Sequence, residues 1–294
     1  MPIADKVKAL LDRKGLRSGL VPLVSYLARS RGCGVERIFY DKGIWIHETH
    51  IGCFAYHQPF VRLNMSRMDE LAKINFLWGY TPKVGDVVID VGAGVGEEAL
   101  TFSRAVGKHG TVICIEAHPR TFGCLEKLVQ YNRLENVIAI HQAVAEPACR
   151  VAIIEDSDDY LGNRSGAAKG ISVPATTIDA IYQQLGLGKV HFLKMNIEGA
   201  ERFAIQGMTQ TLQHTEVLCI SCHDFLAKAA GDDCLRTKSA VQKFLQQSGL
   251  KIVGREDPGL PPYVRDQVWA YSEQGMKKMG VREGEDFSRA VALG

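Results

Sequence analysis

Alternation of apolar strands with amphipathic helices between residues 86 and 272 is the feature that most limits the fold of this 294-residue chain. Apolar, β-branched runs predict strands at 86–91, 111–116, 136–141, 189–195, 215–222, 250–253 and 266–272. Amphipathic stretches predict helices at 97–106, 119–132, 177–185, 199–212 and 236–248. Strands that alternate with helices in this way form a parallel sheet covered by helices on both faces. The expected fold class is therefore α/β, a doubly wound Rossmann-like fold with a mostly parallel seven-stranded sheet.

The segments on either side of this pattern have a different character. Residues 1–68 are expected to form an N-terminal extension of helices and a β-hairpin, which serves as a substrate cap or an oligomer contact. Residues 69–274 form the α/β domain, and residues 275–294 form a polar C-terminal tail. Within the domain, the polar stretch Asp156–Gly170 is a candidate lid over a substrate.

Charge and hydropathy exclude several classes of protein. The formal net charge is +2, without the clustered Lys and Arg residues that bind nucleic acid, so no nucleic-acid partner is expected. No apolar stretch approaches the ~20 residues that span a bilayer, and the N-terminus has no secretion signal. We therefore expect a cytoplasmic protein without a membrane span. The segments His47–Cys53 and Glu155–Asp159 carry metal-binding residue types, but in no established spacing, and no metal is expected.

A glycine-rich loop, Gly92-Ala93-Gly94-Val95-Gly96, follows the strand predicted at 86–91. Glycines permit positive φ angles and close approach of a ligand, and open α/β sheets bind cofactors at this end of their strands. A dinucleotide fingerprint requires glycine where this chain has Glu97. A carboxylate there would also compete with a pyrophosphate for the positive end of the helix dipole. The loop therefore favours a nucleotide-type cofactor without a pyrophosphate.

Two carboxylates narrow the choice of cofactor. Asp90, two residues before Gly92, suits a ligand with an ammonium group, which it would orient directly or through water. Glu116 ends the second strand, where a carboxylate can accept hydrogen bonds from both hydroxyls of a ribose. Together they predict S-adenosyl-L-methionine as the cofactor, with Gln142 and Ala143 beside its adenine. The expected cofactor-binding residues are Asp90, Gly92, Ala93, Gly94, Gly96, Glu116, Ala117, Gln142 and Ala143.

A second motif, Lys194-Met195-Asn196-Ile197-Glu198-Gly199-Ala200-Glu201, follows the strand at 189–195. It is preceded by Thr176–Asp179 and followed, after the next strand, by Cys222–Asp224. With Asp90–Gly96, Glu116, Asn132 and Ala143, this set resembles the FkbM-type S-adenosylmethionine-dependent methyltransferases over roughly residues 70–225. The resemblance implies a class I methyltransferase domain and O-methylation of hydroxyls on macrolides, sugars and glycolipids.

The chain departs from the family at Asn196, where members usually carry Asp. An Asn cannot act as a general base and is a weaker metal ligand, so the base must be another residue. His223 is the first candidate because imidazole titrates near neutral pH, and Asp224 would orient it. Glu198 is the alternative base. Lys194 is expected to stabilise a developing alkoxide, and Asn196 to hydrogen-bond the substrate hydroxyl or the cofactor near its methyl group.

The leading functional hypothesis is O-methylation of a small or medium hydroxylated substrate, such as a secondary metabolite, a sugar or a glycolipid. N-methylation of a small amine or amide is the alternative enzyme activity. A regulator that binds the cofactor without turnover is a further hypothesis, prompted by Asn196. A homo-oligomer is compatible with the sequence, and an NAD-dependent oxidoreductase is disfavoured by Glu97.

Overall fold

A seven-stranded sheet forms the centre of the computed structural model, which describes residues 17–30, 32–61, 63–146, 150–154, 164–165, 170–231, 233–255 and 258–278. The strands are β4 (Val87–Val91), β5 (Thr111–Glu116), β6 (Val137–His141), β11 (Val190–Met195), β12 (Thr215–Ser221), β13 (Lys251–Gly254) and β14 (Gln267–Tyr271). Their order is β13-β14-β12-β11-β4-β5-β6. Only β14 runs against its neighbours β12 and β13. The predicted doubly wound, mostly parallel fold is confirmed.

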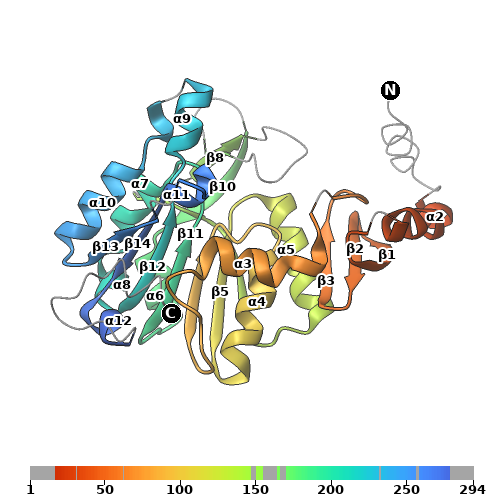
Figure 1. The fold of residues 1–294 in the computed structure, drawn as a ribbon, viewed down its shortest axis with the longest axis horizontal. Coiled ribbons are helices and arrows are strands. Elements are labelled where there is room, and N and C mark those ends of the chain that lie inside the picture. Colours follow the sequence, from red (N-terminus) through yellow and green to blue (C-terminus); the bar gives the residue numbers. More distant parts are fainter. Residues whose placement is uncertain are drawn as a thin grey trace.

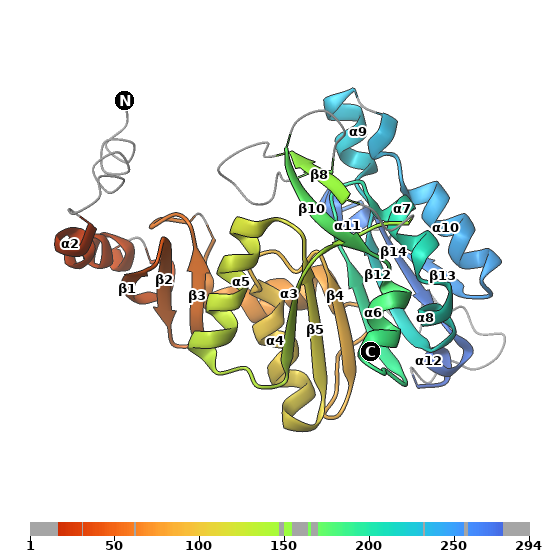
Figure 2. The same ribbon diagram turned by 180° about the vertical axis from the view of Figure 1, so that it is seen from behind.

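Helices cover both faces of this sheet. They are α3 (Met68–Phe76), α4 (Glu97–Val106), α5 (Pro119–Asn132), α6 (Ile178–Gln184), α7 (Glu201–Ala204), α8 (Thr209–Gln213), α9 (Asp224–Ala230), α10 (Lys238–Gln247), α11 (Pro262–Arg265) and α12 (Glu273–Lys278). Figure 1 shows α3 and α4 in front of the sheet, and Figure 2 shows α6 and α8 in front of its other face. Because side chains alternate along each strand, Val88 packs towards α4 while Ile89 packs towards α6.

Most predicted helices lie at their expected positions, but the one at 199–212 is broken. It consists of α7, a 3-10 helix at Ile205–Gly207, and α8. Gly207 lies at the break, where an added Cβ would approach Thr177 Cβ to 2.8 Å. Close packing against the start of α6 thus takes precedence over a continuous helical pattern. The short helices α9 and α11 were not predicted.

The described part of the N-terminal extension contains α2 (Arg17–Ser30) and a three-stranded antiparallel sheet. The sheet consists of β1 (Val35–Asp41), β2 (Ile44–Thr49) and β3 (Gly52–Tyr56). It packs on α4 and α5 through a shared apolar cluster that includes Phe54, Leu100 and Leu128. Asn132 of α5 accepts a hydrogen bond from Cys53 N at 2.8 Å and donates one to Cys53 O at 2.7 Å. The extension therefore lies against the two helices that follow the glycine loop and β5.

A second, smaller sheet lies beyond the third strand of the domain. Its strands are β7 (Ala143–Val144), β8 (Arg150–Ile154), β9 (Arg164–Ser165) and β10 (Ile171–Thr176). The candidate lid Asp156–Gly170 lies outside the described residues except for 164–165 and 170, as does the C-terminal tail after 278. Among the described residues, no helix has the length and apolarity needed to cross a membrane.

Candidate active site

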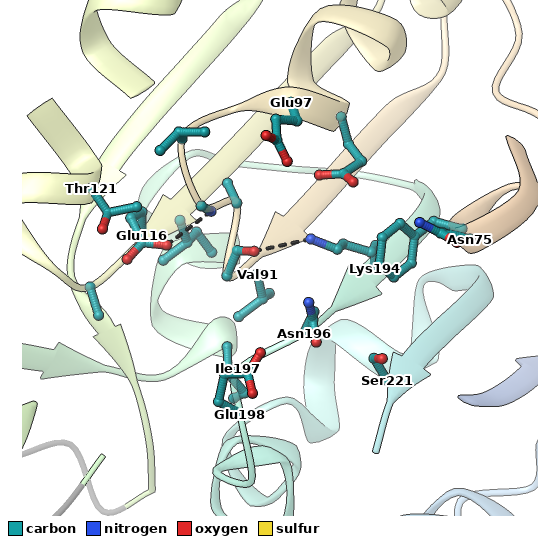
Figure 3. A pocket seen from close by; sticks show the side chains of 18 of the residues that line it. Asn75, Val91, Glu97, Glu116, Thr121, Lys194, Asn196, Ile197, Glu198 and Ser221 are labelled. Carbon is teal, nitrogen blue, oxygen red and sulfur yellow. Dashed lines mark hydrogen bonds between the residues drawn. The ribbon is translucent and has the colours of Figure 1, made fainter. Parts of the chain in front are cut away.

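A cavity of about 560 Å³ opens at the carboxyl ends of β4, β5, β11 and β12. From β4 the chain continues to β5 on one side of it, whereas β11 pairs with β4 on the other side. The carboxyl end of β4 is therefore the topological switch point, where open α/β sheets bind ligands. Figure 3 shows Glu97 and Glu116 on one side of this cavity and Asn196 and Glu198 on the other. The cavity is also lined by Leu63, Met68, Leu71, Asn75, Phe76, Ser221, His223, Phe225, Leu226 and Tyr263.

The glycine loop forms one wall of the cavity. Gly92, Gly94 and Gly96 have φ angles of 74°, 58° and 92°. The amides of Gly92 and Ala93 donate to Ile115 O at 2.8 and 3.1 Å, which fixes the loop over the end of β5. A Cβ at Gly92 would collide with the carbonyl oxygen of Asn196. Gly92 therefore allows the loops after β4 and β11 to meet.

Glu116 ends β5 as predicted and lies in the cavity wall. Its Oε2 accepts a hydrogen bond from Gly94 N at 3.0 Å, and its Oε1 accepts one from His118 N at 2.8 Å. Burial raises the pKa of this carboxyl to about 7, against the lowering effect of those two bonds. Each oxygen keeps a further lone pair for a ligand, so Glu116 can receive the two hydroxyls of a ribose.

Asp90 does not lie in the cavity wall, contrary to expectation. Its carboxylate is fully buried, and Lys194 Nζ lies 2.8 Å from its Oδ1. The two residues are register partners on adjacent strands, β4 and β11. Lys194 also donates to Gly92 O at 3.0 Å (Figure 3), and its ammonium lies 4.9 Å from the centre of the Phe76 ring. Burial lowers the pKa of Lys194, but Asp90 and Glu98 outweigh this and hold it well above its usual value.

This ion pair changes the expected roles of both residues. Asp90 is neutralised beneath the loop, where a ligand in the cavity does not touch it. Lys194 reaches the cavity wall, but its charge is already bound to Asp90 and Gly92 O rather than directed at an acceptor oxygen. Both residues therefore hold the ends of β4 and β11 together. This contact replaces the two predicted ones, of Asp90 with the ammonium of the cofactor and of Lys194 with a developing alkoxide.

The remaining expected cofactor residues fall into two groups. Gly92, Ala93, Gly94, Glu116, Ala117 and Gln142 all line the cavity. Gly96 and Ala143 do not. An added Cβ at Gly96 would approach Leu125 Cδ1 to 2.8 Å, so this glycine serves the packing of α4 on α5. Ala143 packs with Val173 in the apolar cluster beneath the smaller sheet.

His223 sits between two carboxylates on the opposite wall. Its Nδ1 lies 3.0 Å from Glu201 Oε1, and its Nε2 lies 3.3 Å from Glu198 Oε2. Glu201 is fully buried, and its Oε2 accepts a hydrogen bond from Thr237 Oγ1 at 3.1 Å. Burial lowers the pKa of His223, but the hydrogen bonds to Glu198 and Glu201 outweigh it and raise the pKa to about 10. At neutral pH the imidazole is therefore protonated, which argues against its predicted role as general base.

Asp224 does not orient His223 as expected. Its Oδ1 accepts hydrogen bonds from the backbone amides of Thr237 and Lys238 at 2.8 and 2.9 Å. These amides begin α10, so Asp224 joins the start of α9 to the start of α10. The partner that orients His223 is Glu201 instead.

Glu198 and Asn196 are two polar groups of this wall with capacity for a ligand. Glu198 has a φ of 52°, a strained backbone conformation of the kind found at functional sites. Its side chain is 19% exposed, against 4% for His223, so the carboxylate is the more accessible of the two in the cavity wall. The Oδ1 of Asn196 is buried without a hydrogen-bond partner among the described residues. A substrate hydroxyl can therefore be received by both side chains.

Comparison with known protein families identifies the family of this chain. The methyltransferase FkbM domain family matches residues 90–243, which is more than half of the chain. The chain belongs to this family. It is therefore a methyltransferase whose cofactor is S-adenosyl-L-methionine. No curated protein matches the chain.

Solved structures similar to this FkbM-type methyltransferase are distant in sequence. The FkbM methyltransferase from Methylobacillus flagellatus KT is 17% identical, with a TM-score of 0.44 over 64% of this chain and 44% of that one. Aeropyrum pernix fibrillarin, crystallised with natively bound S-adenosyl-L-methionine, is 16% identical, with a TM-score of 0.41 over 81% and 98%. A putative O-methyltransferase from Klebsiella pneumoniae is 9% identical, with a TM-score of 0.43 over 92% and 95%. Likeness at this level is no guide to the substrate.

The cavity of this methyltransferase fits its cofactor in charge and size. The cofactor carries a sulfonium, an ammonium and one carboxylate, so its net charge is positive. The cavity wall holds the carboxylates of Glu97, Glu98, Glu116 and Glu198. Its volume of about 560 Å³ falls within the range of about 300–1,000 Å³ typical of small-molecule sites. Within the described ranges, no three His, Cys, Asp or Glu side chains converge as a metal site would require.

Proposed function

We propose that this methyltransferase acts on oxygen, transferring a methyl group to a hydroxyl of a small or medium-sized substrate such as a secondary metabolite, a sugar or a glycolipid. The observation that carries this proposal is the chain of hydrogen bonds from Glu201 through His223 to Glu198, which ends at the cavity wall. An alcohol has a high pKa, so its attack on a methyl group benefits from a positioned proton acceptor. The Glu198 carboxylate supplies that acceptor.

The cofactor fits the half of the cavity formed by the loops after β4 and β5. Glu116 would receive the two ribose hydroxyls, and Ala117 and Gln142 would lie beside the adenine. The backbone of Gly92 to Gly94 would lie along the amino-acid end. Bound in this way, S-adenosyl-L-methionine supplies a methyl group on a positively charged sulfur, which an oxygen attacks in line.

Glu198 and Asn196 would act on the substrate hydroxyl, with Glu198 positioned by His223. Asn196 Oδ1, which has no other partner among the described residues, can orient a hydroxyl or hydrogen-bond the cofactor near its methyl group. When the methyl group of the cofactor is transferred to the hydroxyl oxygen, Glu198 would take the hydroxyl proton. His223 keeps its own proton throughout and holds the Glu198 carboxylate in place. It is a positioning residue and not the base.

The walls around this hydroxyl site are largely apolar. Side chains of α3, α9 and α11 contribute Met68, Leu71, Phe76, Phe225 and Tyr263 to the cavity. Apolar lining with a few placed polar groups is typical of sites for organic ligands. An acceptor with an apolar body and a hydroxyl directed at Glu198 therefore suits this half of the cavity.

Methyl transfer from carbon-13-labelled S-adenosyl-L-methionine tests the proposal. We expect label on oxygen when the protein is incubated with a panel of sugars, aromatic alcohols and aliphatic alcohols, read from the chemical shift of the transferred methyl. The substitution Glu198→Gln should lower kcat by about 10²- to 10⁴-fold, the usual contribution of a general base. Affinity for S-adenosylhomocysteine should stay within about twofold, since Glu198 lies outside the proposed cofactor contacts. Glu135→Gln, at an exposed position, serves as the control.

Other outcomes point elsewhere. Unchanged turnover in Glu198→Gln would overturn the assignment of the base. Label on nitrogen, in a panel that includes amines, would support N-methylation. The carboxylates of the cavity favour this alternative because they attract cationic amines. Binding of S-adenosylhomocysteine without transfer to any acceptor would favour a regulator.

A further inference from the structure

Two adjacent carboxylates in the first turn of α4 line the cavity beside the glycine loop, but only one has a partner. Glu97 Oε1 accepts a hydrogen bond from Tyr56 OH at 2.6 Å. Tyr56 belongs to β3, so the N-terminal extension holds Glu97 in place. Glu98 has no ion pair and no side-chain hydrogen bond within the described residues, apart from its own backbone amide. Its carboxylate is thus available to a ligand.

The charges around Glu98 make it a site for a cation. Burial raises the pKa of Glu98 to about 7; Lys194 opposes this effect, while Glu97 and Asp90 add to it. Lys194 offers only partial compensation, because its ammonium is already bound by Asp90 and Gly92 O. A positive group that entered beside Glu98 would therefore meet a carboxylate whose charge Lys194 neutralises only in part.

The cofactor brings such a group to this wall. The amino-acid end of S-adenosyl-L-methionine carries an ammonium, and the loop at Gly92–Gly94 adjoins the first turn of α4. The residue expected from the sequence to meet this ammonium, Asp90, is fully buried beneath the loop and paired with Lys194. A carboxylate on the cavity wall can take its place.

We propose that the carboxylate of Glu98 binds the ammonium group of the cofactor's amino-acid end. This inference rests on the cofactor placement given under the proposed function. Glu97, although adjacent, has a different role, because its carboxylate is held by Tyr56 and links the extension to the loop.

Calorimetric titration with two ligands tests the assignment. S-adenosylhomocysteine carries the ammonium, whereas 5′-methylthioadenosine has the same adenosine and thioether but no amino-acid end. We expect Glu98→Gln to weaken S-adenosylhomocysteine about tenfold or more, as the loss of a hydrogen bond to a charged group does. Binding of 5′-methylthioadenosine should change by less than about twofold. The matched variant Glu97→Gln, which keeps an acceptor for Tyr56, should change both affinities by less than about threefold.

A second readout follows protons rather than affinity. Because Glu98 is partly protonated near pH 7, an ammonium bound beside it displaces that proton. Binding heats measured in buffers of different ionisation enthalpy should show more proton release, or less uptake, in the wild-type protein than in Glu98→Gln.

The outcomes separate this inference from the proposed function. If S-adenosylhomocysteine does not bind the wild-type protein, the cofactor placement itself is wrong. If it binds equally to wild type and Glu98→Gln, only the role of Glu98 is overturned. Equal losses in Glu97→Gln and Glu98→Gln, or an equal loss of 5′-methylthioadenosine, would also overturn it, because the effect would then not be specific to Glu98 and the ammonium.

Discussion

The cofactor half and the acceptor half of the cavity are built in different ways. The cofactor half consists mainly of the backbone from Gly92 to Gly94, with Glu116 hydrogen-bonded to it. The acceptor half consists of side chains from distant segments, such as Phe76, Glu198 and Tyr263. A local motif defines the first, whereas only the complete fold assembles the second. Fold and cofactor are therefore easier to infer than the substrate.

The two halves also differ in how their charges are balanced. In the cofactor half, Glu98 and Glu116 are buried carboxyls whose pKa values are raised to about 7. In the acceptor half, two carboxylates surround His223, whose pKa is raised to about 10. On our proposal, a positive ligand completes the first arrangement, whereas the second already contains its cation. Different substitutions and different pH ranges should therefore affect them.

The largest effect is expected from Gly92→Ala, which disturbs the backbone of the cofactor half. The residue has a φ of 74°, and a Cβ would collide with the carbonyl oxygen of Asn196. Since that oxygen belongs to the backbone, it cannot move aside cheaply. We expect affinity for S-adenosylhomocysteine to fall more than about 100-fold and the free energy of unfolding to fall by about 3 kcal/mol or more.

A matched variant separates the effect of the steric collision from the effect of the positive φ angle. Gly186 has a φ of 59° but open space around its Cβ direction. Gly186→Ala should cost only about 1 kcal/mol of stability, the strain of a left-handed residue, and should leave cofactor affinity unchanged. If the two variants lose the same cofactor affinity in calorimetry and the same stability in urea unfolding, the close contact between Gly92 and the Asn196 carbonyl does not form the site.

His223→Asn should have the next largest effect, on the acceptor half. It removes the cation between Glu198 and Glu201, and the fully buried Glu201 is left without a neutralising charge. Loss of one partner from a buried pair costs about 3 kcal/mol. Because the folded pKa of about 10 exceeds the ordinary value of 6.5, this stabilisation is full below about pH 6.5 and is lost as pH rises through about 10.

Urea unfolding at several pH values measures that loss. The difference in unfolding free energy between wild type and His223→Asn should be greatest near pH 6 and small above pH 10. His214→Asn, at an exposed position, is the control and should show little pH dependence. A difference that grows with pH would mean that His223 is neutral in the folded protein, and the role of general base would return to it.

The sequence placed the glycine loop and Glu116 together at the cavity because short-range patterns determine their positions. Strand β4, the turn at Gly92 and the carboxylate of Glu116 lie in one uninterrupted stretch, and each follows from local residue preferences. The placement of Asp90 was wrong for a physical reason. Its neutralisation by Lys194 depends on the pairing of β4 with β11, about a hundred residues later, which a local pattern does not encode.

The acceptor half was predicted only in part. The motif at 194–201 and His223 identified residues that do meet, but not how they pair. The short helices α9 and α11, which bring Phe225 and Tyr263 to the cavity, span too few residues to show a helical period. The orientation of His223 by Glu201 rather than Asp224 depends on where α10 begins, because Asp224 is engaged by its first amides.

The smallest expected effect concerns the ionisation of the cofactor half. Because the pKa values of Glu98 and Glu116 are raised from 4.5 to about 7, the folded protein binds protons more tightly than the unfolded chain there. Their contribution to stability is therefore best below about pH 4.5 and declines as pH rises through about 7, by about 3 kcal/mol in all for each group and by about 2 kcal/mol between pH 5 and 6.5. Between about pH 5 and 6.5 the His223 cluster should contribute a constant amount, since this range lies below the unfolded pKa of His.

Urea unfolding at about pH 5 and pH 6.5 can therefore isolate the cofactor half. Glu98→Gln and Glu116→Gln should each reduce the decline in unfolding free energy seen in the wild-type protein, whereas the exposed control Glu135→Gln should not. Other carboxyls act in the opposite direction: ion pairs with Lys189 and Lys278 outweigh burial and lower the pKa of Glu216, so the wild-type slope alone is not diagnostic. If the unfolding free energy changes equally with pH in all four proteins, the charges of Glu98 and Glu116 are already neutralised in the free protein. The two halves would then differ in how they are built but not in how their charges are balanced.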